Sequence, residues 1–243
     1  MSLYTAFLSG GGSGITGWFA EFAETFEKCF IREDRYKLLL DGIGVTIKVS
    51  LLAAVLGLII GFLIAICSLS KNKLLRFFGK VYTDVIRGTP SVTQLMIIYF
   101  VVFATVNWEK WIIAAIAFSI NSGAYVSEII RAGILSIDKG QTEAGRSLGL
   151  NSVQTMFYIV VPQAIKNIFP AMCNEFITLI KETAIVGYVG LVDIQKAGDF
   201  IKSATFEAFM PLIATAIIYF VLIKILTLVL GVLEARLRKS DIR

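Results

Sequence analysis

Polar side chains inside long apolar runs are the residues of this sequence that could do chemistry. Within a lipid bilayer such groups are costly unless they are paired or face a water-filled path, so they nominate functional positions. The candidates are Gln94, Asn121, Ser122, Tyr125, Glu175, Thr178 and Glu182. The last three recur at spacings of three and four residues, which places them close to one helical face. A carboxylate with amide and hydroxyl groups can bind a small polar molecule by hydrogen bonds.

The residue types that the sequence lacks exclude several kinds of chemistry. There is no His among the 243 residues, which removes His-dependent triads, His metal sites and His proton relays. Cys29, Cys67 and Cys173 lie far apart without metal-ligand spacing, so we interpret them as small buried residues. A G-x-x-x-x-G-K-[ST] phosphate loop is absent, so the chain does not hold ATP in the usual way. With neither His nor clustered carboxylates, a membrane-embedded enzyme is disfavoured.

Composition places the chain in a membrane. Hydrophobic residues make up 56% of the sequence and charged residues 17%, and the mean hydropathy is +0.77, far more apolar than a soluble domain needs. The formal charge of +5 comes from basic residues beside apolar runs, where they face anionic lipid, so we expect no nucleic-acid partner. The chain is predicted to be an all-α integral membrane protein.

Five apolar runs are predicted to be transmembrane helices, at residues 49–70, 91–106, 111–127, 165–192 and 210–233. Gly88-Thr89-Pro90 breaks the chain before the second run. Lys181-Glu182-Thr183 interrupts the fourth, so one helix crosses there and a second apolar piece bends back or lies near the far surface.

Basic residues set the predicted orientation. Lys and Arg collect after the first span, between Arg131 and Lys166, and at the C-terminus. Positively charged loops are retained on the cytoplasmic side. With an odd number of spans, the N-terminus is predicted to lie outside and the C-terminus in the cytoplasm.

The chain is predicted to divide shortly before the first span. Residues 1–40 are predicted to form an extracytoplasmic or interfacial segment, and residues 41–243 one transmembrane domain. The N-terminus lacks the features of a signal peptide, so we expect it to stay attached. Residues 15–31 place aromatic side chains at helical spacing among three glutamates, which suits a helix on the membrane surface, with packing against the bundle as the alternative.

A long segment of polar and mixed character, residues 136–167, contrasts with the otherwise short connections between the apolar runs of this sequence. A broken apolar stripe runs through or beside it, made by Ile134, Ile137, Ala144, Leu148 and Leu150. Gly145 and Gly149 allow close approach of another surface, and Pro162 is expected to end the local pattern before the next span. From the residues alone, this is either a helix pair that docks on a partner or an ordinary cytoplasmic loop.

The same segment resembles the EAA signature loop of ABC importer permeases. Its Glu143-Ala144-Gly145, then Gly149, then Ile159-Val160-Val161-Pro162 follow the family pattern of Glu-Ala-Ala, a Gly four residues on, and Ile-x-Leu-Pro. Gly145 and Val161 depart from that pattern by small or apolar exchanges. The polar amino acid permease subfamily is resembled by Arg87-Gly88-Thr89-Pro90 with Gln94, by residues 123–128 with Arg131-Ala132-Gly133, and by Lys139-Gly140-Gln141. The resemblance covers roughly residues 40 to 235.

This resemblance implies a type I ABC importer permease fold and a set of partners. These are cytoplasmic ABC ATPase subunits, a second permease subunit, an extracytoplasmic substrate-binding protein and an amino acid substrate. The loop would form a coupling helix that sits in a cleft of the ATPase, with Glu143, Ala144, Gly145, Gly149 and Pro162 as its signature residues. The chain itself would bind no cofactor, because ATP-Mg is used by the partner ATPase.

Four further residues are interpreted as gating or structural. Glu128 and Arg131 are three residues apart and can form an ion pair near the cytoplasmic end. Lys181, with Glu182 and Thr183, resembles the Lys-Asp-Thr-Ser of the family, a motif that occurs whatever the substrate. Arg87 opens the Arg-Gly-Thr-Pro motif and is assigned to the same group.

An ion-driven transporter or channel is the remaining alternative. Such a protein would be expected to show internal repeats and ionisable relays, but no clear repeat is present and five spans do not halve. A single chain of this size is too small to enclose a path, so we predict a two-fold homodimer in the plasma or inner membrane of a prokaryote. Neither the amino acid carried nor the presence of a sister permease follows from the sequence.

Overall fold

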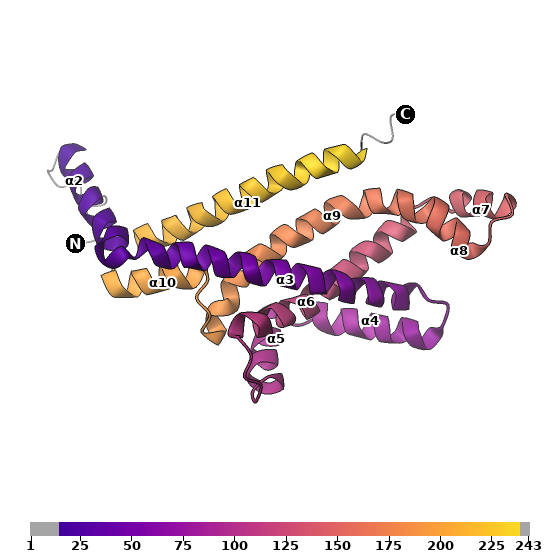
Figure 1. Cartoon of the computed structure of the whole chain (residues 1–243), viewed down its shortest axis with the longest axis horizontal. Coiled ribbons are helices and arrows are strands. Elements are labelled where there is room, and N and C mark those ends of the chain that lie inside the picture. The colour runs from indigo at the N-terminus through magenta and orange to yellow at the C-terminus, as the bar shows by residue number, and fades with distance from the viewer. Residues whose placement is uncertain (1–14, 239–243) are drawn as a thin grey trace.

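The structure of the chain, a computed structural model, describes residues 15–238. Within that range the chain forms helices joined by short turns, without a β-strand (Figure 1). The all-α prediction is therefore confirmed. Residues 1–14 of the predicted N-terminal segment and residues 239–243 lie outside the described part.

Among the described residues, four helical runs are long and apolar enough to cross a bilayer. They are α3 (Tyr36–Leu69), α6 (Lys110–Leu135), the run Ser152–Val189 that contains α9 (Val161–Glu182), and α11 (Phe209–Arg238). A fifth span results if α4 (Lys73–Arg87) counts together with Ser91–Val102, which begins with α5 (Ser91–Ile97). The two parts of that pair meet at 104°, at the predicted break Gly88-Thr89-Pro90.

The first two spans differ from their predicted boundaries. α3 begins at Tyr36 rather than at residue 49, because Leu39, Gly42 and Thr46 in its first half are buried. The second span ends as a helix at Val102 rather than at residue 106. The basic residues that follow the first span lie mostly on helix α4, not in a loop, because apolar residues recur between them at helical spacing.

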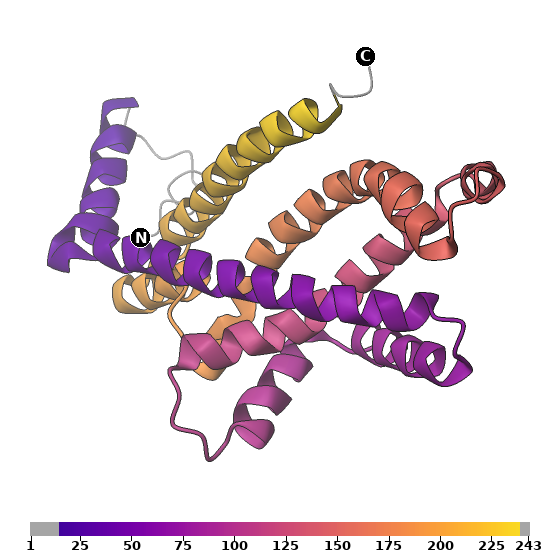
Figure 2. The same cartoon turned by 45° about the vertical axis from the view of Figure 1, so that its right-hand side comes forward.

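Helices α3 and α6 form the centre of the bundle (Figure 2). Gly57 lies against Ser122, and a Cβ on Gly61 would lie 2.4 Å from Val126 Cγ1. Small residues let the two backbones approach closely, as is usual where helices pack in lipid. Phe118 on α6 anchors the buried apolar cluster around this contact.

Helix α9 begins where the sequence predicted an end. Pro162 lies in the first turn of α9, directly after the π-helical turn Met156–Val160, so the helical run passes through the proline instead of ending at it. The helix ends at Glu182, within the predicted interruption, and a 3-10 turn, Thr183–Val189, carries the chain on to Gly190.

The described N-terminal helix lies at one end of the molecule. In Figures 1 and 2, α2 (Ile15–Phe26) and the signature loop lie at opposite ends. Cys29 and Phe30, which follow α2, are buried with Ala197 and Ile201 of α10 (Ile194–Thr205). The end of this segment thus packs on the bundle, and its position on a membrane surface stays a prediction.

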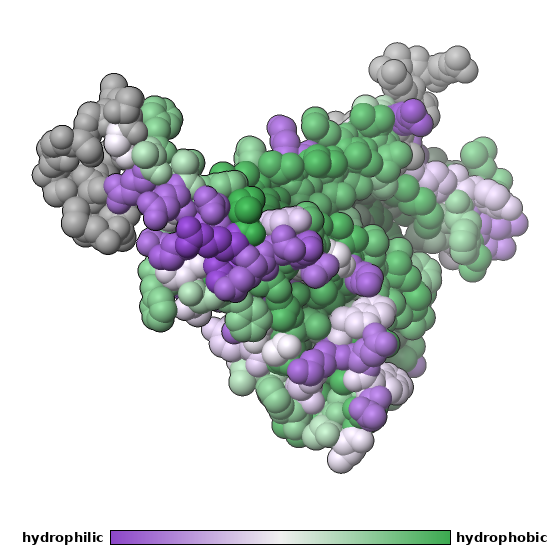
Figure 3. Space-filling model, turned by 60° about the vertical axis from the view of Figure 1, so that its left-hand side comes forward, coloured by the Kyte–Doolittle hydropathy of each residue, from purple (hydrophilic) through white to green (hydrophobic). Residues whose placement is uncertain are grey.

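Much of the surface is apolar. Figure 3 shows broad hydrophobic areas on one face, with hydrophilic residues in separate patches. The most apolar 18-residue window of α11 has no residue buried within the chain. Lipid or another protein chain must cover such a surface.

Candidate functional site

Two short helices and a tight turn form the tip of the signature loop. α7 (Lys139–Ser147) is capped by Asp138, whose Oδ1 accepts a hydrogen bond from the Gly140 N–H at 2.6 Å. α8 (Ser152–Thr155) begins with a reciprocal capping box between Asn151 and Gln154. Both helix starts are encoded by local sequence, so the tip has a defined conformation.

The turn between α7 and α8 is closed by backbone hydrogen bonds. The N–H groups of Leu148 and Leu150 donate to the carbonyls of Ala144 and Gly145 at 3.0 and 3.2 Å. Gly149 has a φ of +86°, and a Cβ there would meet nothing within 4 Å. The turn therefore requires glycine for its left-handed backbone and not for space.

Gly145, which replaces the family's alanine, is required for a different reason. It is buried, and a Cβ there would lie 2.6 Å from Ile159 Cδ1 and 2.9 Å from Thr155 Cγ2. The missing side chain lets α7 lie directly on the start of the following helical run. An alanine at this position would force these two side chains to move.

The outer surface of the tip is exposed and partly apolar. Glu143 and Ala144 are exposed. Large apolar side chains accompany them, namely Leu148, Val153, Phe157 and Tyr158, with exposed fractions of 65% to 80%. In Figures 1 and 2 the tip projects from the end of the molecule. An apolar patch on a projecting polar loop is suited to docking on another protein.

Gln94 and Asn121 were predicted to line a substrate path. In the structure they are hydrogen-bonded to each other, and Gln94 is also hydrogen-bonded to the turn between α4 and α5. The Gln94 Nε2 donates to the Ile86 carbonyl at 2.7 Å and to Thr89 Oγ1 at 2.6 Å, and its Oε1 accepts from Asn121 Nδ2 at 2.9 Å. Both side chains are buried. They tie the sharp turn between α4 and α5 to α6, and a contact with substrate stays a prediction.

The other predicted path residues are only partly brought together. Ser122 Oγ donates to Glu175 Oε1 at 2.7 Å, which joins α6 to α9. Glu182 is half-buried one turn beyond Thr178, whereas Thr178 itself and Lys181 are exposed. The structure thus pairs Ser122 with Glu175 and leaves the polar groups at the end of α9 open to a partner or to solvent.

Arg87, Tyr125, Glu128 and Arg131 meet near the signature-loop end of α6. The predicted ion pair is present, with Arg131 Nη2 at 2.8 Å from Glu128 Oε2, and the Arg87 guanidinium lies 5.2 Å from the centre of the Tyr125 ring. The first three of these residues line a cavity of about 540 Å³ between α6 and α9. Charged and aromatic side chains thus gather at one open cavity beside these helices, while a gating role stays a prediction.

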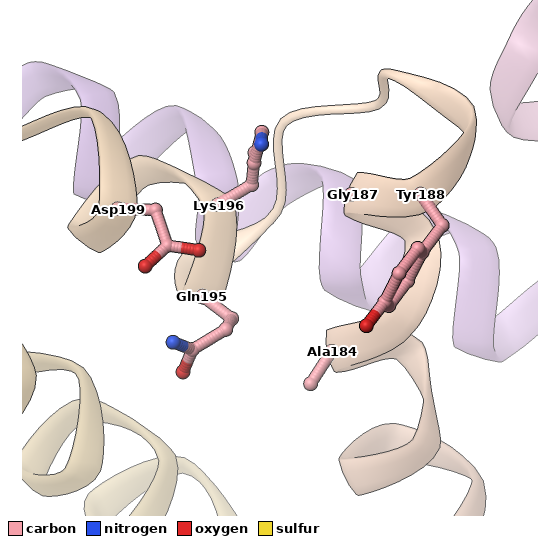
Figure 4. A pocket seen from close by; sticks show the side chains of 6 residues that line it. All are labelled: Ala184, Gly187, Tyr188, Gln195, Lys196 and Asp199. Carbon is pink, nitrogen blue, oxygen red and sulfur yellow. The ribbon is translucent and has the colours of Figure 1, made fainter. Parts of the chain in front are cut away.

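A second cavity, which the sequence did not indicate, lies beyond the other end of α9. It has a volume of about 330 Å³ and is lined by Ala184, Gly187, Tyr188, Gln195, Lys196 and Asp199. Gln195 and Asp199 on α10 face Tyr188 and Ala184 across the space between the two segments (Figure 4). The sequence pattern that could have indicated this cavity is that of α10. Ile194, Ala197 and Ile201 recur there at helical spacing and are buried, and polar residues lie between them.

A fully buried carboxylate holds this cavity's helix in place. Asp193 accepts hydrogen bonds from the Lys196 and Gln195 N–H groups at 2.9 and 3.2 Å, which caps α10. It also accepts from the Tyr219 hydroxyl of α11 at 2.9 Å. The start of α10 is therefore fixed to the last helix.

Comparison with known proteins gives one family for most of the chain. Residues 57–239 match the family described as "Binding-protein-dependent transport system inner membrane component". A putative glutamine transport system permease protein GlnP of Rickettsia bellii is 42% identical over 201 residues, which cover 82% of this chain and 92% of that protein. The arginine transport system permease protein ArtQ of Bacillus subtilis is 42% identical over 205 residues, 84% of this chain and 94% of the relative.

Solved structures of ABC transporters are also similar to this chain. A crystal structure of an amino acid ABC transporter with histidines is similar with a TM-score of 0.78 and 41% identity, covering 85% of this chain and 98% of the other. An inward-facing structure of the MetNI methionine ABC transporter has a TM-score of 0.72 at 18% identity, and that likeness concerns the fold alone.

Proposed function

The chain belongs to the family of binding-protein-dependent transport system inner membrane components, and on this premise we propose that it carries an amino acid across the membrane as the permease subunit of an ABC importer. It is an integral membrane protein with several apolar helices. As a permease component it does not hydrolyse ATP, since a separate ATPase subunit does so.

The substrate proposal rests on the relatives. The proteins with about 42% identity are named for glutamine and arginine transport. Their substrates share an ammonium and a carboxylate and differ in a polar side chain. A polar amino acid is therefore the substrate class, and the paired Ser122 and Glu175 together with Tyr125 and Glu182 are the side chains proposed to line its path.

Coupling to the ATPase is assigned to the tip of the signature loop. The observation that carries this proposal is the projecting α7–α8 turn, whose backbone is fixed by caps and by Gly149 while large apolar side chains remain exposed on it. A rigid apolar projection can fill a cleft of a partner and transmit its movement. The proposed contact residues are Glu143, Ala144 and Leu148.

The assembly and its placement complete the proposal. Two copies of the chain would enclose the path, which fits the apolar surface that the chain leaves uncovered. The signature loop and C-terminus would lie in the cytoplasm, and residues 1–40 outside or at the membrane surface, in the plasma or inner membrane of a bacterium. Residues 41–243 would form the transmembrane domain.

The test is an association measurement between the full-length permease and its ATPase in lipid nanodiscs. Leu148 is 80% exposed, and burying a leucine contributes about 1.5–3 kcal/mol, so Leu148→Arg is expected to weaken association about 10- to 100-fold. Substrate-stimulated ATP hydrolysis should fall in parallel.

Phe206→Arg is the matched control. Phe206 is 94% exposed and follows α10, at the other end of α9, so the same kind of exchange there should leave association unchanged. Equal affinity for Leu148→Arg and the unchanged chain would overturn the assignment of the tip as the coupling surface.

A further inference from the structure

A third cavity is lined by more basic than acidic side chains. It has a volume of about 350 Å³ and is lined by Arg76, Lys80, Arg87, Arg131, Asp84, Glu128, Ser68 and Thr83. Ser68 is next to the end of α3, α4 begins at Lys73, and Arg131 lies about one helical turn before the end of α6. The cavity therefore opens toward the end of the bundle that carries the signature loop.

The lining of this cavity carries two more basic than acidic groups, because four basic side chains are matched there by only two carboxylates, Asp84 and Glu128. Arg131 is paired with Glu128 at 2.8 Å. Within the described residues, Arg76, Lys80 and Arg87 take part in no ion pair. Basic groups gathered at the edge of a membrane protein are costly unless an anion or water compensates them. A bound anion would remove their mutual repulsion.

Helix α4 places these basic groups directly beside an apolar surface. Its exposed apolar residues recur at spacings of three and four and are Leu74, Phe77, Phe78, Val81 and Val85, with exposed fractions of 41% to 62%. Gly79 and Thr83 are buried, and a Cβ on Gly79 would lie 2.5 Å from Ser68 Oγ, so this side of α4 packs on α3. Arg76, Lys80 and Arg87 lie between the packed side and the apolar side.

Basic groups beside an apolar surface are complementary to a phospholipid, in which a phosphate is joined to apolar chains. We propose that the basic cavity binds the phosphate of an anionic phospholipid headgroup on the signature-loop side, with its acyl chains along the apolar side of α4. Basic pockets between spanning helices on the cytoplasmic side are suited to such headgroups. A soluble phosphate shares the headgroup chemistry but makes no use of the adjacent apolar surface.

The experiment uses the full-length chain purified in a neutral detergent. Native mass spectrometry measures the occupancy of phosphatidylglycerol, of phosphatidylcholine with the same chains, and of inorganic phosphate. Phosphatidylglycerol is expected to bind most tightly. Since one basic group near the surface changes lipid affinity roughly fivefold, Arg76→Gln with Lys80→Gln is expected to weaken phosphatidylglycerol binding about 30-fold.

The control is Lys71→Gln with Lys73→Gln, which removes the same charge at the same end from residues that are exposed and outside the cavity lining. It should change the affinity by less than about threefold, because solvent and salt screen exposed charges outside the cavity from a headgroup bound inside it. If the double cavity variant fails to fold, Lys80→Gln alone decides, with an expected loss of about fivefold.

Three results would overturn the proposal. The control could lose as much affinity as the cavity variant, which would make the binding a general effect of surface charge. Phosphatidylcholine could bind as tightly as phosphatidylglycerol, which would remove the role of anionic charge. Inorganic phosphate could bind alone with the same dependence on Lys80, which would identify a soluble ligand instead of a lipid.

Discussion

Replacing Gly149 by alanine should weaken coupling without disturbing the membrane helices. The φ of Gly149 is +86°, and a side chain there would meet no atom within 4 Å, so the substitution adds backbone strain and no clash. An L-residue in the left-handed region costs about 1–2 kcal/mol. If the ATPase binds only the ordered turn, association should weaken by roughly 5- to 30-fold.

A series of substitutions isolates that cause. Asparagine tolerates the left-handed region better than alanine does, so affinity should fall in the order Gly, Asn, Ala at position 149. Affinity for the ATPase is measured in nanodiscs, together with substrate-stimulated ATP hydrolysis. Gly44→Ala serves as the control, because Gly44 lies in helix α3 and a Cβ there also meets nothing within 4 Å.

Either of two outcomes would refute this reasoning. If Gly149→Ala binds the ATPase as tightly as the unchanged chain, the left-handed turn is not required for docking. If Asn is as harmful as Ala, backbone strain is not the cause and the added side chain itself must obstruct the partner. An equal loss in Gly44→Ala would point to a general effect of replacing glycine.

Two further substitutions test the interior of the bundle. Gly61→Ala should lower the thermal unfolding midpoint by overpacking against Val126, at a cost of about 1–3 kcal/mol, and strict additivity with Val126→Ala would contradict the close α3–α6 contact. Gln94→Leu should destabilise the fold by about 1–3 kcal/mol because it leaves Asn121 and the Ile86 carbonyl without their partner, whereas unchanged stability with lost transport would assign Gln94 to the substrate path alone.

Features that depend on local sequence were predictable. The chain break at Gly88-Thr89-Pro90 appears as the 104° bend, and the ion pair of Glu128 with Arg131 forms across one helical turn. The apolar runs identify membrane helices because hydropathy over about 20 residues reflects transfer into lipid. The signature loop could be recognised because its glycine at position 149, which the family pattern shares, is fixed by a left-handed turn.

Features that depend on distant contacts were not predictable. Gln94 and Asn121 are 27 residues apart, and their hydrogen bond exists only because the bend returns α5 to α6.

Helix α4 was not predicted as a helix because its basic residues lower the mean hydropathy of a segment whose apolar side is nonetheless continuous. The interpretation of the cysteines as buried holds for Cys29 and is wrong for Cys67 and Cys173, which are partly exposed.

The length of helix α9 determines how far its far end moves when the helix tilts at the signature loop. Its 22 residues extend about 33 Å, with the α7–α8 tip of the signature loop before its first turn and the cavity beside Ala184 directly after its last. Pro170 lies inside this helix and removes one of its backbone hydrogen bonds. If the helix nevertheless keeps its shape and pivots near the loop, a tilt of about 6° moves the far end by about 3.5 Å, roughly the thickness of one side chain. Under that condition, a small rotation at the loop is enough to displace Ala184, at the edge of the far cavity, by about the thickness of one side chain.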